Sequence, residues 1–216
     1  MLQQQEKNAL KLSVVVEAGG KSCRMGKNKA LMPLSGQPLI QHVIDRVKHI
    51  AIELFIVCNN SSEFEFLDVN ITNDSISGKG ALGGLFTAMD ISSNEYVAVV
   101  ACDLPFVSTK ILLYCLDLLI QSGADAAIPK TGDDYFEPLH AVYRREPCKK
   151  AIFQAIMQNK RRAISWLPQV NVIEINSDLW RDLDPSGLAF FNVNTMEDFI
   201  EAEKTIQKLF KQNNSV

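Results

Sequence analysis

A glycine-rich loop with several basic side chains follows the first apolar run of the chain. The run covers residues 12–16, and the loop after it, residues 17–34, contains three lysines and one arginine. Backbone N–H groups at the carboxyl end of a buried strand, together with fixed cationic side chains, bind the phosphates of nucleotides. We therefore expect this loop to hold a nucleoside triphosphate.

An aspartate stands at a comparable position later in the chain. Asp103 follows the apolar run at residues 96–102 and directly precedes Leu104 and Pro105. Open α/β sheets bind their ligands at the carboxyl ends of their strands. We expect the Asp103 carboxylate beside the ligand, although an aspartate here can also cap a helix or form a turn.

The composition limits the class of protein. The chain has 216 residues, of which 47% are hydrophobic, and this is enough to bury the core of one domain. A formal charge of −3 and a pI near 5.7 leave no broad basic surface, which argues against a nucleic-acid partner. Eight polar-rich residues at the start and no long apolar run argue against a secretory signal and a membrane span.

The cysteines indicate the compartment. The five cysteines are widely spaced, and no two of them form a C-x-x-C pair. This pattern is typical of neither a zinc site nor a redox couple. It favours a reducing, cytoplasmic compartment.

Strands and helices are expected to alternate along the chain. Apolar runs between turn residues predict strands at residues 12–16, 54–58, 69–72, 96–102, 124–128, 139–143, 172–175 and 188–193. Helical spacing of apolar residues predicts helices at residues 38–47, 81–91, 111–120, 149–157 and 163–167. Thr195, with Asp198 three residues later, predicts the cap of a closing helix. The alternation predicts a three-layer α/β/α sandwich around a doubly wound, mostly parallel sheet, in a single domain of residues 1–216.

The basic loop has neither the Walker A spacing nor G-x-G-x-x-G. Its residues 18–20, 24–26, 29–31 and 36–40 instead resemble the opening of sugar-phosphate-type nucleotidyltransferases, specifically the molybdenum cofactor guanylyltransferases. Later blocks also resemble that family, at residues 73–84, 102–106, 137–143 and 191–195. Because the blocks occur in order over about residues 12–199, the set is far more specific than any one of them.

The resemblance implies transfer of GMP from GTP to the terminal phosphate of molybdopterin, with pyrophosphate leaving and Mg²⁺ as cofactor. Attack on an α-phosphorus depends mainly on positioning and positive charge. By resemblance, Arg24 and Lys29 supply that charge and Asp103 binds Mg²⁺. Loss of either cation is expected to cost roughly 3 kcal/mol of barrier, about a hundredfold in rate.

The same resemblance assigns further residues to GTP. The backbone amides of Ala18, Gly19 and Gly20 are expected close to the nucleotide, because glycine permits a close approach. Asp74 is expected to contact the ribose or the base edge. An aspartate before a loop often only forms a turn, and this alternative stays open.

The nucleotide is expected over about residues 12–110 and the acceptor, molybdopterin, over about residues 111–210. Asn192 and Asn194 are candidates to hold the pterin phosphate or to complete the metal shell. Arg161 and Arg162 lie where the family binds the pterin, but a solvated helix end explains them equally well. Enzymes that deliver or accept the cofactor are expected as transient partners.

Glu17 departs from the family, which usually carries an apolar residue at this position. A carboxylate about 4 Å from a phosphate costs on the order of 4 kcal/mol at an effective dielectric of about 20. Glu17 is therefore expected to point away from the triphosphate. It could accept hydrogen bonds from the guanine N1–H and N2–H₂ groups, pair with a lysine of its own loop, or face solvent, and the last two are favoured.

Two residues within the matching blocks are expected to have structural roles. His140 is a lone histidine in an apolar strand, which is typical of a hydrogen-bonded structural residue. Cys102 is expected to act as a small core residue and not as a nucleophile.

The base is less well determined than the reaction. Cytidylyltransferases for the same pterin and transferases that make nucleotide sugars share the opening loop and the strand-end aspartate. A nucleotidyltransferase that uses CTP or a sugar 1-phosphate is therefore the alternative, and a non-catalytic nucleotide-binding homologue is a third hypothesis. The block at residues 192–195 favours guanine by resemblance.

Overall fold

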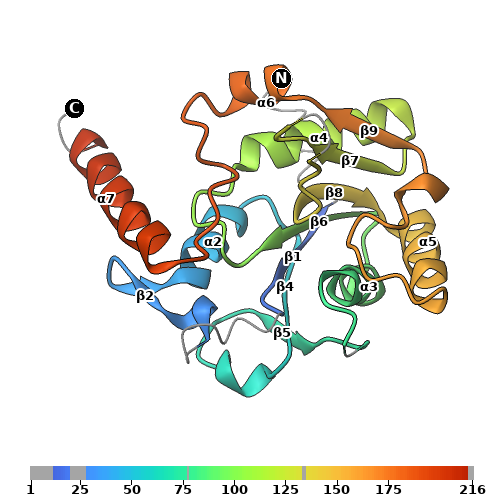
Figure 1. Cartoon of the computed structure of the whole chain (residues 1–216), viewed down its shortest axis with the longest axis horizontal. Coiled ribbons are helices and arrows are strands. Elements are labelled where there is room, and N and C mark those ends of the chain that lie inside the picture. Colours follow the sequence, from blue (N-terminus) through green and yellow to red (C-terminus); the bar gives the residue numbers. More distant parts are fainter. Residues whose placement is uncertain (1–11, 20–27, 77, 133–134, 214–216) are drawn as a thin grey trace.

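A seven-stranded sheet forms the centre of the computed structural model, which describes residues 12–19, 28–76, 78–132 and 135–213 (Figure 1). Its strands, in spatial order, are β5 (Asn70–Asn73), β4 (Glu53–Cys58), β1 (Leu12–Glu17), β6 (Tyr96–Ala101), β8 (His140–Arg144), β7 (Ala126–Pro129) and β9 (Val172–Ile175). All neighbours pair in parallel except β8, which runs antiparallel to both β6 and β7. The expected doubly wound, mostly parallel sheet is confirmed.

Helices cover both faces of this sheet, so the three-layer sandwich is also confirmed (Figure 1). The helices are α2 (Leu39–Val47), α3 (Ala81–Ile91), α4 (Thr109–Ser122), α5 (Arg145–Met157), α6 (Ser177–Leu183) and α7 (Met196–Asn213). Residues of α2 and α4 pack in one core cluster, and residues of α3 and α5 pack in the other. Among the described residues, no helix has both the length and the apolar character needed to cross a membrane.

Strand β1 is buried on both faces because its alternate side chains serve opposite cores. Val14 and Val16 belong to the cluster under α2 and α4, whereas Val15 belongs to the cluster under α3 and α5. Such a strand reads as a continuous apolar run. Its last residue, Glu17, pairs with Val57 of β4 and Ala101 of β6, so the three strands end at one edge.

The strand expected at residues 188–193 is wrong, because residues 189–190 form a turn and the rest of this segment has no regular secondary structure. Phe191 N–H donates to Leu188 O (2.9 Å), and Val193 N–H donates to Asp103 O (3.0 Å). Both edges of β6 are already paired, with β1 and β8, so no adjacent strand position is open.

Two smaller differences concern helices. The helix expected at residues 163–167 is a turn followed by a 3-10 helix, η4 (Leu167–Gln169). Pro168 explains this, because a proline disfavours the α conformation of the residue before it. Helix α6 was not expected, since its seven residues offer too short a pattern.

The predicted cap of the closing helix is confirmed. Thr195 Oγ1 accepts from Asp198 N–H (3.1 Å), and Asp198 Oδ2 accepts from Thr195 N–H (2.8 Å). This reciprocal pair is a capping box, with aspartate in the usual place of glutamate. It fixes the start of α7, which packs Phe199 and Ile206 against Leu34 and Phe106.

We expect Thr195→Ala to lower the free energy of unfolding by about 1 kcal/mol, because an N–H of the first turn loses its acceptor. Urea denaturation measures the change. Glu197→Ala, an exposed residue of the same turn, is the matched control and should have little effect. Equal losses in the two variants would show that the cap does not stabilise α7.

Candidate active site

A cavity of about 410 Å³ opens at the edge where β1 and β6 end. Five segments line it: the end of β1 with the two residues after it, the 3-10 helix that begins at Lys29, the end of β6 with the residues after it, the segment before β8, and the loop before α7. Its walls comprise Glu17, Ala18, Gly19, Lys29, Ala101, Cys102, Asp103, Leu104, Glu137, Pro138, Leu139, Asn192 and Asn194. The carboxyl ends of the parallel strands β1 and β6 and the start of the antiparallel strand β8 lie at this edge, which is why segments distant in the chain share one cavity.

Lys29 is the centre of the polar contacts in this cavity. Its Nζ donates to Asp103 Oδ2 (2.7 Å) and to Asn194 Oδ1 (3.0 Å). Lys29 lies in the 3-10 helix η2 (Lys29–Leu31), where the Asn28 side chain caps the turn by accepting from Ala30 N–H. A lysine carries three N–H donors, so one remains for a ligand.

Asp103 carries one satisfied and one unsatisfied oxygen. Its Oδ2 is held by Lys29, while Oδ1 is buried and has no hydrogen-bond partner among the described residues. An unpaired buried polar atom costs free energy unless a ligand satisfies it. Mg²⁺ binds through one or two carboxylates and completes its shell with water and phosphate oxygens, so Oδ1 fits a Mg²⁺ ligand. In the described part of the chain, no three His, Cys, Asp or Glu residues form a larger metal cluster.

Glu17 is buried against α3, and its expected solvent exposure is wrong. The side chain is 5% exposed, and a Cβ added at Gly84 would overlap its carboxylate. Oε2 has no hydrogen-bond partner among the residues described. Burial raises the pKa of Glu17 well above its ordinary value of 4.5, and the charges of Asp74 and Asp103 raise it further. No described lysine pairs with it, and Lys21 and Lys27 lie outside the described residues.

Asp74 forms the turn that was its alternative interpretation. Its Oδ1 accepts from Ile76 N–H (3.1 Å) and from Thr87 Oγ1 (2.7 Å), which joins the loop to α3. Asp74 does not line the cavity, although its charge acts on Glu17. A contact between Asp74 and a nucleotide stays a prediction.

The loop residues expected near GTP divide into two groups. Ala18 N–H already donates to Val57 O (2.7 Å), so it continues the sheet and is not free for a phosphate. Gly19 lines the cavity, and a Cβ added to it would lie 3.9 Å from Asn59 Oδ1. Gly20 and Arg24 lie outside the described residues, so their roles stay predictions.

The residues expected to bind the acceptor also divide. Asn192 and Asn194 both line the cavity. Arg161 and Arg162 are exposed in the segment after α5 and are not among the residues that line it. The structure therefore brings the two asparagines to Lys29 and Asp103 but leaves the two arginines outside.

Glu137 is a wall residue that sequence reasoning missed. Its half-buried carboxylate accepts from Thr131 Oγ1 (2.8 Å), and burial together with Asp103 raises its pKa. A signal was present, because Glu137 directly precedes Pro138 and the apolar run of β8 inside one of the matching blocks. The walls thus hold three carboxylates with Lys29 as their cation in the described part of the chain.

His140 and Cys102 have structural surroundings. His140 is fully buried, with Nδ1 at 3.2 Å from Ala189 O and Nε2 at 3.3 Å from Ser108 O, and burial lowers its pKa to about 4. It is therefore neutral near pH 7 and ties two loops together. Burial raises the pKa of the Cys102 thiol, which disfavours the thiolate that a nucleophile needs.

We expect Glu17→Gln to stabilise the protein, and to do so more at about pH 8 than at about pH 5. The folded-state pKa of Glu17 is raised, so stability is retained below the unfolded value of 4.5 and falls as the pH rises towards the folded value. Glutamine does not ionise and escapes this loss. Urea denaturation at both pH values measures it.

Glu201→Gln, which removes an exposed carboxylate of α7, is the control. The change in the free energy of unfolding that it causes should be the same at both pH values. A stabilisation by Glu17→Gln that is the same at both pH values would show that burial of the carboxylate is not what limits stability.

Solved structures share this architecture. Molybdopterin-guanine dinucleotide biosynthesis protein A from Archaeoglobus fulgidus superposes with a TM-score of 0.79 and 29% identity, covering 91% of this chain and 99% of that chain. A 4-diphosphocytidyl-2C-methyl-D-erythritol synthase from Anaerococcus prevotii has a TM-score of 0.66 and 15% identity, covering 91% of this chain and 98% of that chain. The second likeness concerns the fold alone.

Sequence comparison identifies the family. Residues 14–170 match the family described as the MobA-like NTP transferase domain. A probable molybdenum cofactor guanylyltransferase from Carboxydothermus hydrogenoformans is 33% identical over 87% of this chain and 93% of its own length. One from Natranaerobius thermophilus is 31% identical over 91% of this chain and 97% of its own length. The chain is therefore a nucleotidyltransferase that belongs to the molybdenum cofactor guanylyltransferase family.

Proposed function

We propose that this enzyme transfers GMP from GTP to the terminal phosphate of molybdopterin and releases pyrophosphate. The observation that carries the proposal is the meeting of Lys29, Asp103 and Asn194 in one cavity at the carboxyl edge of β1 and β6. The names of the relatives support the choice of guanine and of molybdopterin. Glycine and basic residues directly after β1 support a triphosphate donor.

Lys29 acts on the phosphates in this proposal. Two of its N–H groups donate to Asp103 and Asn194, which fixes the position of the ammonium. The third N–H remains available to donate to a phosphate oxygen. A fixed cation needs no reorganisation when negative charge develops on the leaving pyrophosphate. Arg24 adds a planar, multi-donor group to the same phosphates.

Asp103 is the proposed Mg²⁺ ligand, through the buried Oδ1 that lacks a protein partner. When bound, Mg²⁺ neutralises charge on the phosphoryl oxygens. Glu17 and Glu137 lie in the same walls, and a bound dication would favour the charged forms of both carboxyl groups, whose pKa values are raised without it.

The nucleotide is proposed over the N-terminal half, with Ala18, Gly19 and Gly20 beneath it and Asp74 at its ribose or base. The space beside Gly19 supports a close approach. Glu17, which carries an unpaired oxygen on the cavity wall, is the proposed acceptor for the guanine N1–H and N2–H₂ groups.

The pterin is proposed over the C-terminal half, with Asn192 and Asn194 at its phosphate and Arg161 and Arg162 as outer contacts. The four cysteines that the structure describes are free, which supports action in the reducing cytoplasm. Transient contact with enzymes that deliver or accept the cofactor follows from the same proposal.

A pyrophosphate-release assay with GTP and with CTP, each with and without molybdopterin, tests the substrates. We expect release from GTP that depends on molybdopterin. Glu17→Leu should weaken GTP binding and leave CTP binding less affected, since CTP lacks the N1–H and N2–H₂ groups of guanine. Release from CTP alone would overturn the guanine assignment, and unchanged GTP binding by Glu17→Leu would remove the base contact.

Lys29→Ala and Asp103→Asn should each lower kcat by roughly a hundredfold, about 3 kcal/mol of barrier, because each removes charge at the reacting phosphates. Lys149→Ala, which removes an ammonium paired with Asp90 away from the cavity, is the control. Steady-state kinetics with saturating Mg²⁺ measures the effect. Variants as active as the control would place the chemistry elsewhere.

A further inference from the structure

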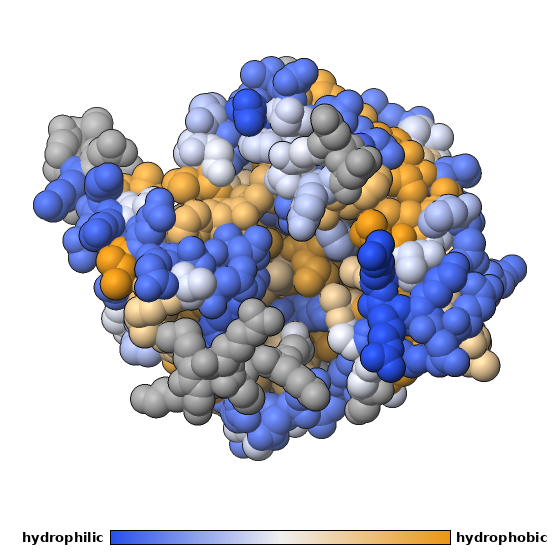
Figure 2. Space-filling model, in the orientation of Figure 1, coloured by the Kyte–Doolittle hydropathy of each residue, from blue (hydrophilic) through white to orange (hydrophobic). Residues whose placement is uncertain are grey.

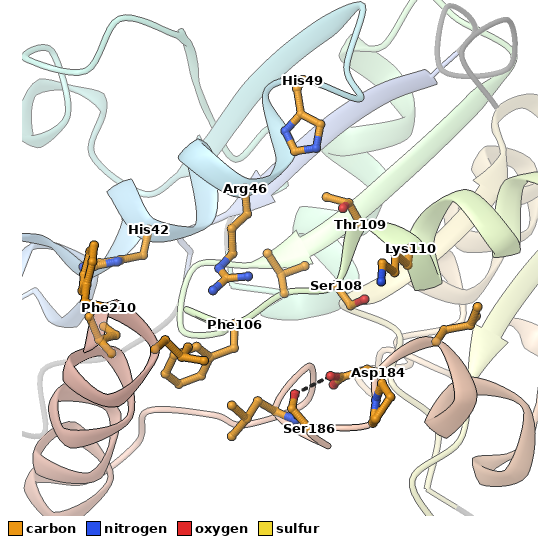
Figure 3. Close-up of a pocket in the computed structure, with 16 residues that line it drawn as sticks. His42, Arg46, His49, Phe106, Ser108, Thr109, Lys110, Asp184, Ser186 and Phe210 are labelled. Carbon is orange, nitrogen blue, oxygen red and sulfur yellow. Dashed lines mark hydrogen bonds between the residues drawn. The ribbon is translucent and has the colours of Figure 1, made fainter. Parts of the chain in front are cut away.

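A second cavity, of about 590 Å³, is shown in Figure 3, and it shares no lining residue with the candidate active site. It is lined by α2, the start of α4 with the residues before it, the end of α6 with the residues after it, and α7. The two cavities have different wall residues, with Leu104 on the catalytic side and Phe106 on this side. Nothing in the proposed reaction uses this second cavity.

Basic side chains dominate one wall. His42, Arg46 and His49 are spaced four and three residues apart, so they share one face of α2 and its continuation, and all three line the cavity. Lys110 extends from the first turn of α4 towards the same space (Figure 3). The positive charges of Arg46 and Lys110 are local, because the chain as a whole carries a formal charge of −3.

The Arg46 side chain extends from α2 into the cavity, towards Phe106 (Figure 3). Its guanidinium lies 5.7 Å from the centre of the Phe106 ring, a cation–π contact that orients the group. Among the described residues, no carboxylate or carbonyl accepts a hydrogen bond from it. Burial lowers its pKa, but a guanidinium stays charged at neutral pH, so its five N–H donors are open to an anion.

The acid in the lining, Asp184, is already engaged. Its Oδ2 accepts from Ala189 N–H (2.7 Å), and its Oδ1 accepts from Ser186 Oγ, as Figure 3 shows. Asp184 raises the pKa of Arg46 but makes no ion pair with it. Arg46 and Lys110 therefore outnumber the one lining carboxylate.

The start of α4 adds donors to the positive wall. Ser108 caps the helix by accepting from Ile111 N–H (3.4 Å), and Ser108, Thr109 and Lys110 all line the cavity. The first N–H groups of a helix have no acceptor within it and carry the positive end of its dipole. This terminus points its charge to the space that Arg46 and Lys110 face.

The opposite wall is apolar. Ile206, Leu209 and Phe210 of α7 line it, and Phe210 is 64% exposed. Figure 2 shows apolar surface between α7 and the loop that leads to it. A ligand that fits both walls needs an anionic group at one end and an apolar body at the other.

We propose that this cavity binds a small organic phosphate. The phosphate lies between Arg46 and Lys110 at the start of α4, and an apolar or aromatic body packs against Leu209 and Phe210. The volume lies within the range of about 300–1,000 Å³ that is typical of small-molecule sites. Arg and helix N-termini are the groups that recognise phosphate with directed hydrogen bonds.

Isothermal titration calorimetry with phenyl phosphate as the probe tests the proposal. Wild type should bind one phenyl phosphate at this cavity, more tightly than inorganic phosphate, because only the former uses the apolar wall. Arg46→Gln should lower the affinity at least tenfold. Lys48→Gln is the matched control, since Lys48 is an exposed cation on the same helix segment, is paired with Asp45 and lies outside the cavity.

Lys29→Ala separates this cavity from the catalytic one, and the probe should bind to that variant as it binds to wild type. Lys110→Gln gives a second measurement if Arg46→Gln is poorly folded, as judged by thermal unfolding, and it too should weaken binding. Equal losses in Arg46→Gln and Lys48→Gln, loss of binding in Lys29→Ala, or no binding to wild type at millimolar probe would overturn the proposal.

Discussion

The parallel register of β1 with β4 and β6 is the constraint on which the site depends. Glu17 of β1 pairs with Val57 and Ala101, so three strands end at one level and their following loops leave from one edge. The register is fixed because β1 buries side chains on both faces, and a slip by one residue would exchange the two cores. Because β1 and β6 end at the same level, the segments that follow them can place Lys29 in contact with Asp103.

The carboxyl groups at this edge of the sheet differ in whether a cation pairs with them. Asp103 is held by Lys29, whereas Glu17 is buried with no cation of its own in the described part of the chain. The pKa of Glu17 is therefore raised, and so is that of Glu137. Carboxyl groups with raised pKa values that share a cavity with a fixed ammonium are typical of a functional site.

Patterns in the sequence predicted most elements, and the errors share a cause. Residues 188–193 have the composition of a strand, but both edges of β6 are already paired. Phe191 N–H therefore donates to Leu188 O within the segment, and Val193 N–H donates to Asp103 O. Glu17 was expected to pair with a lysine of its loop or to face solvent, because a carboxylate close to a phosphate is unfavourable. It is buried because α3 presents Gly84, and the carboxylate fits only where that residue has no side chain. The spacing of residues close in the chain predicts neither the pairing of both edges of β6 nor the position of Gly84 beside Glu17.

The sequence by itself determined the alternation of strands and helices, the basic loop, the strand-end aspartate and the capped start of α7, because each is a property of residues close in the chain. The tertiary structure alone decided that Lys29 contacts Asp103 and Asn194, which lie 74 and 165 residues away. It also decided that Glu137 lines the same cavity as Lys29 and Asp103, and that α7 and Arg46 line a second cavity. Such contacts follow from the order of strands and the packing of helices, which depend on every element together.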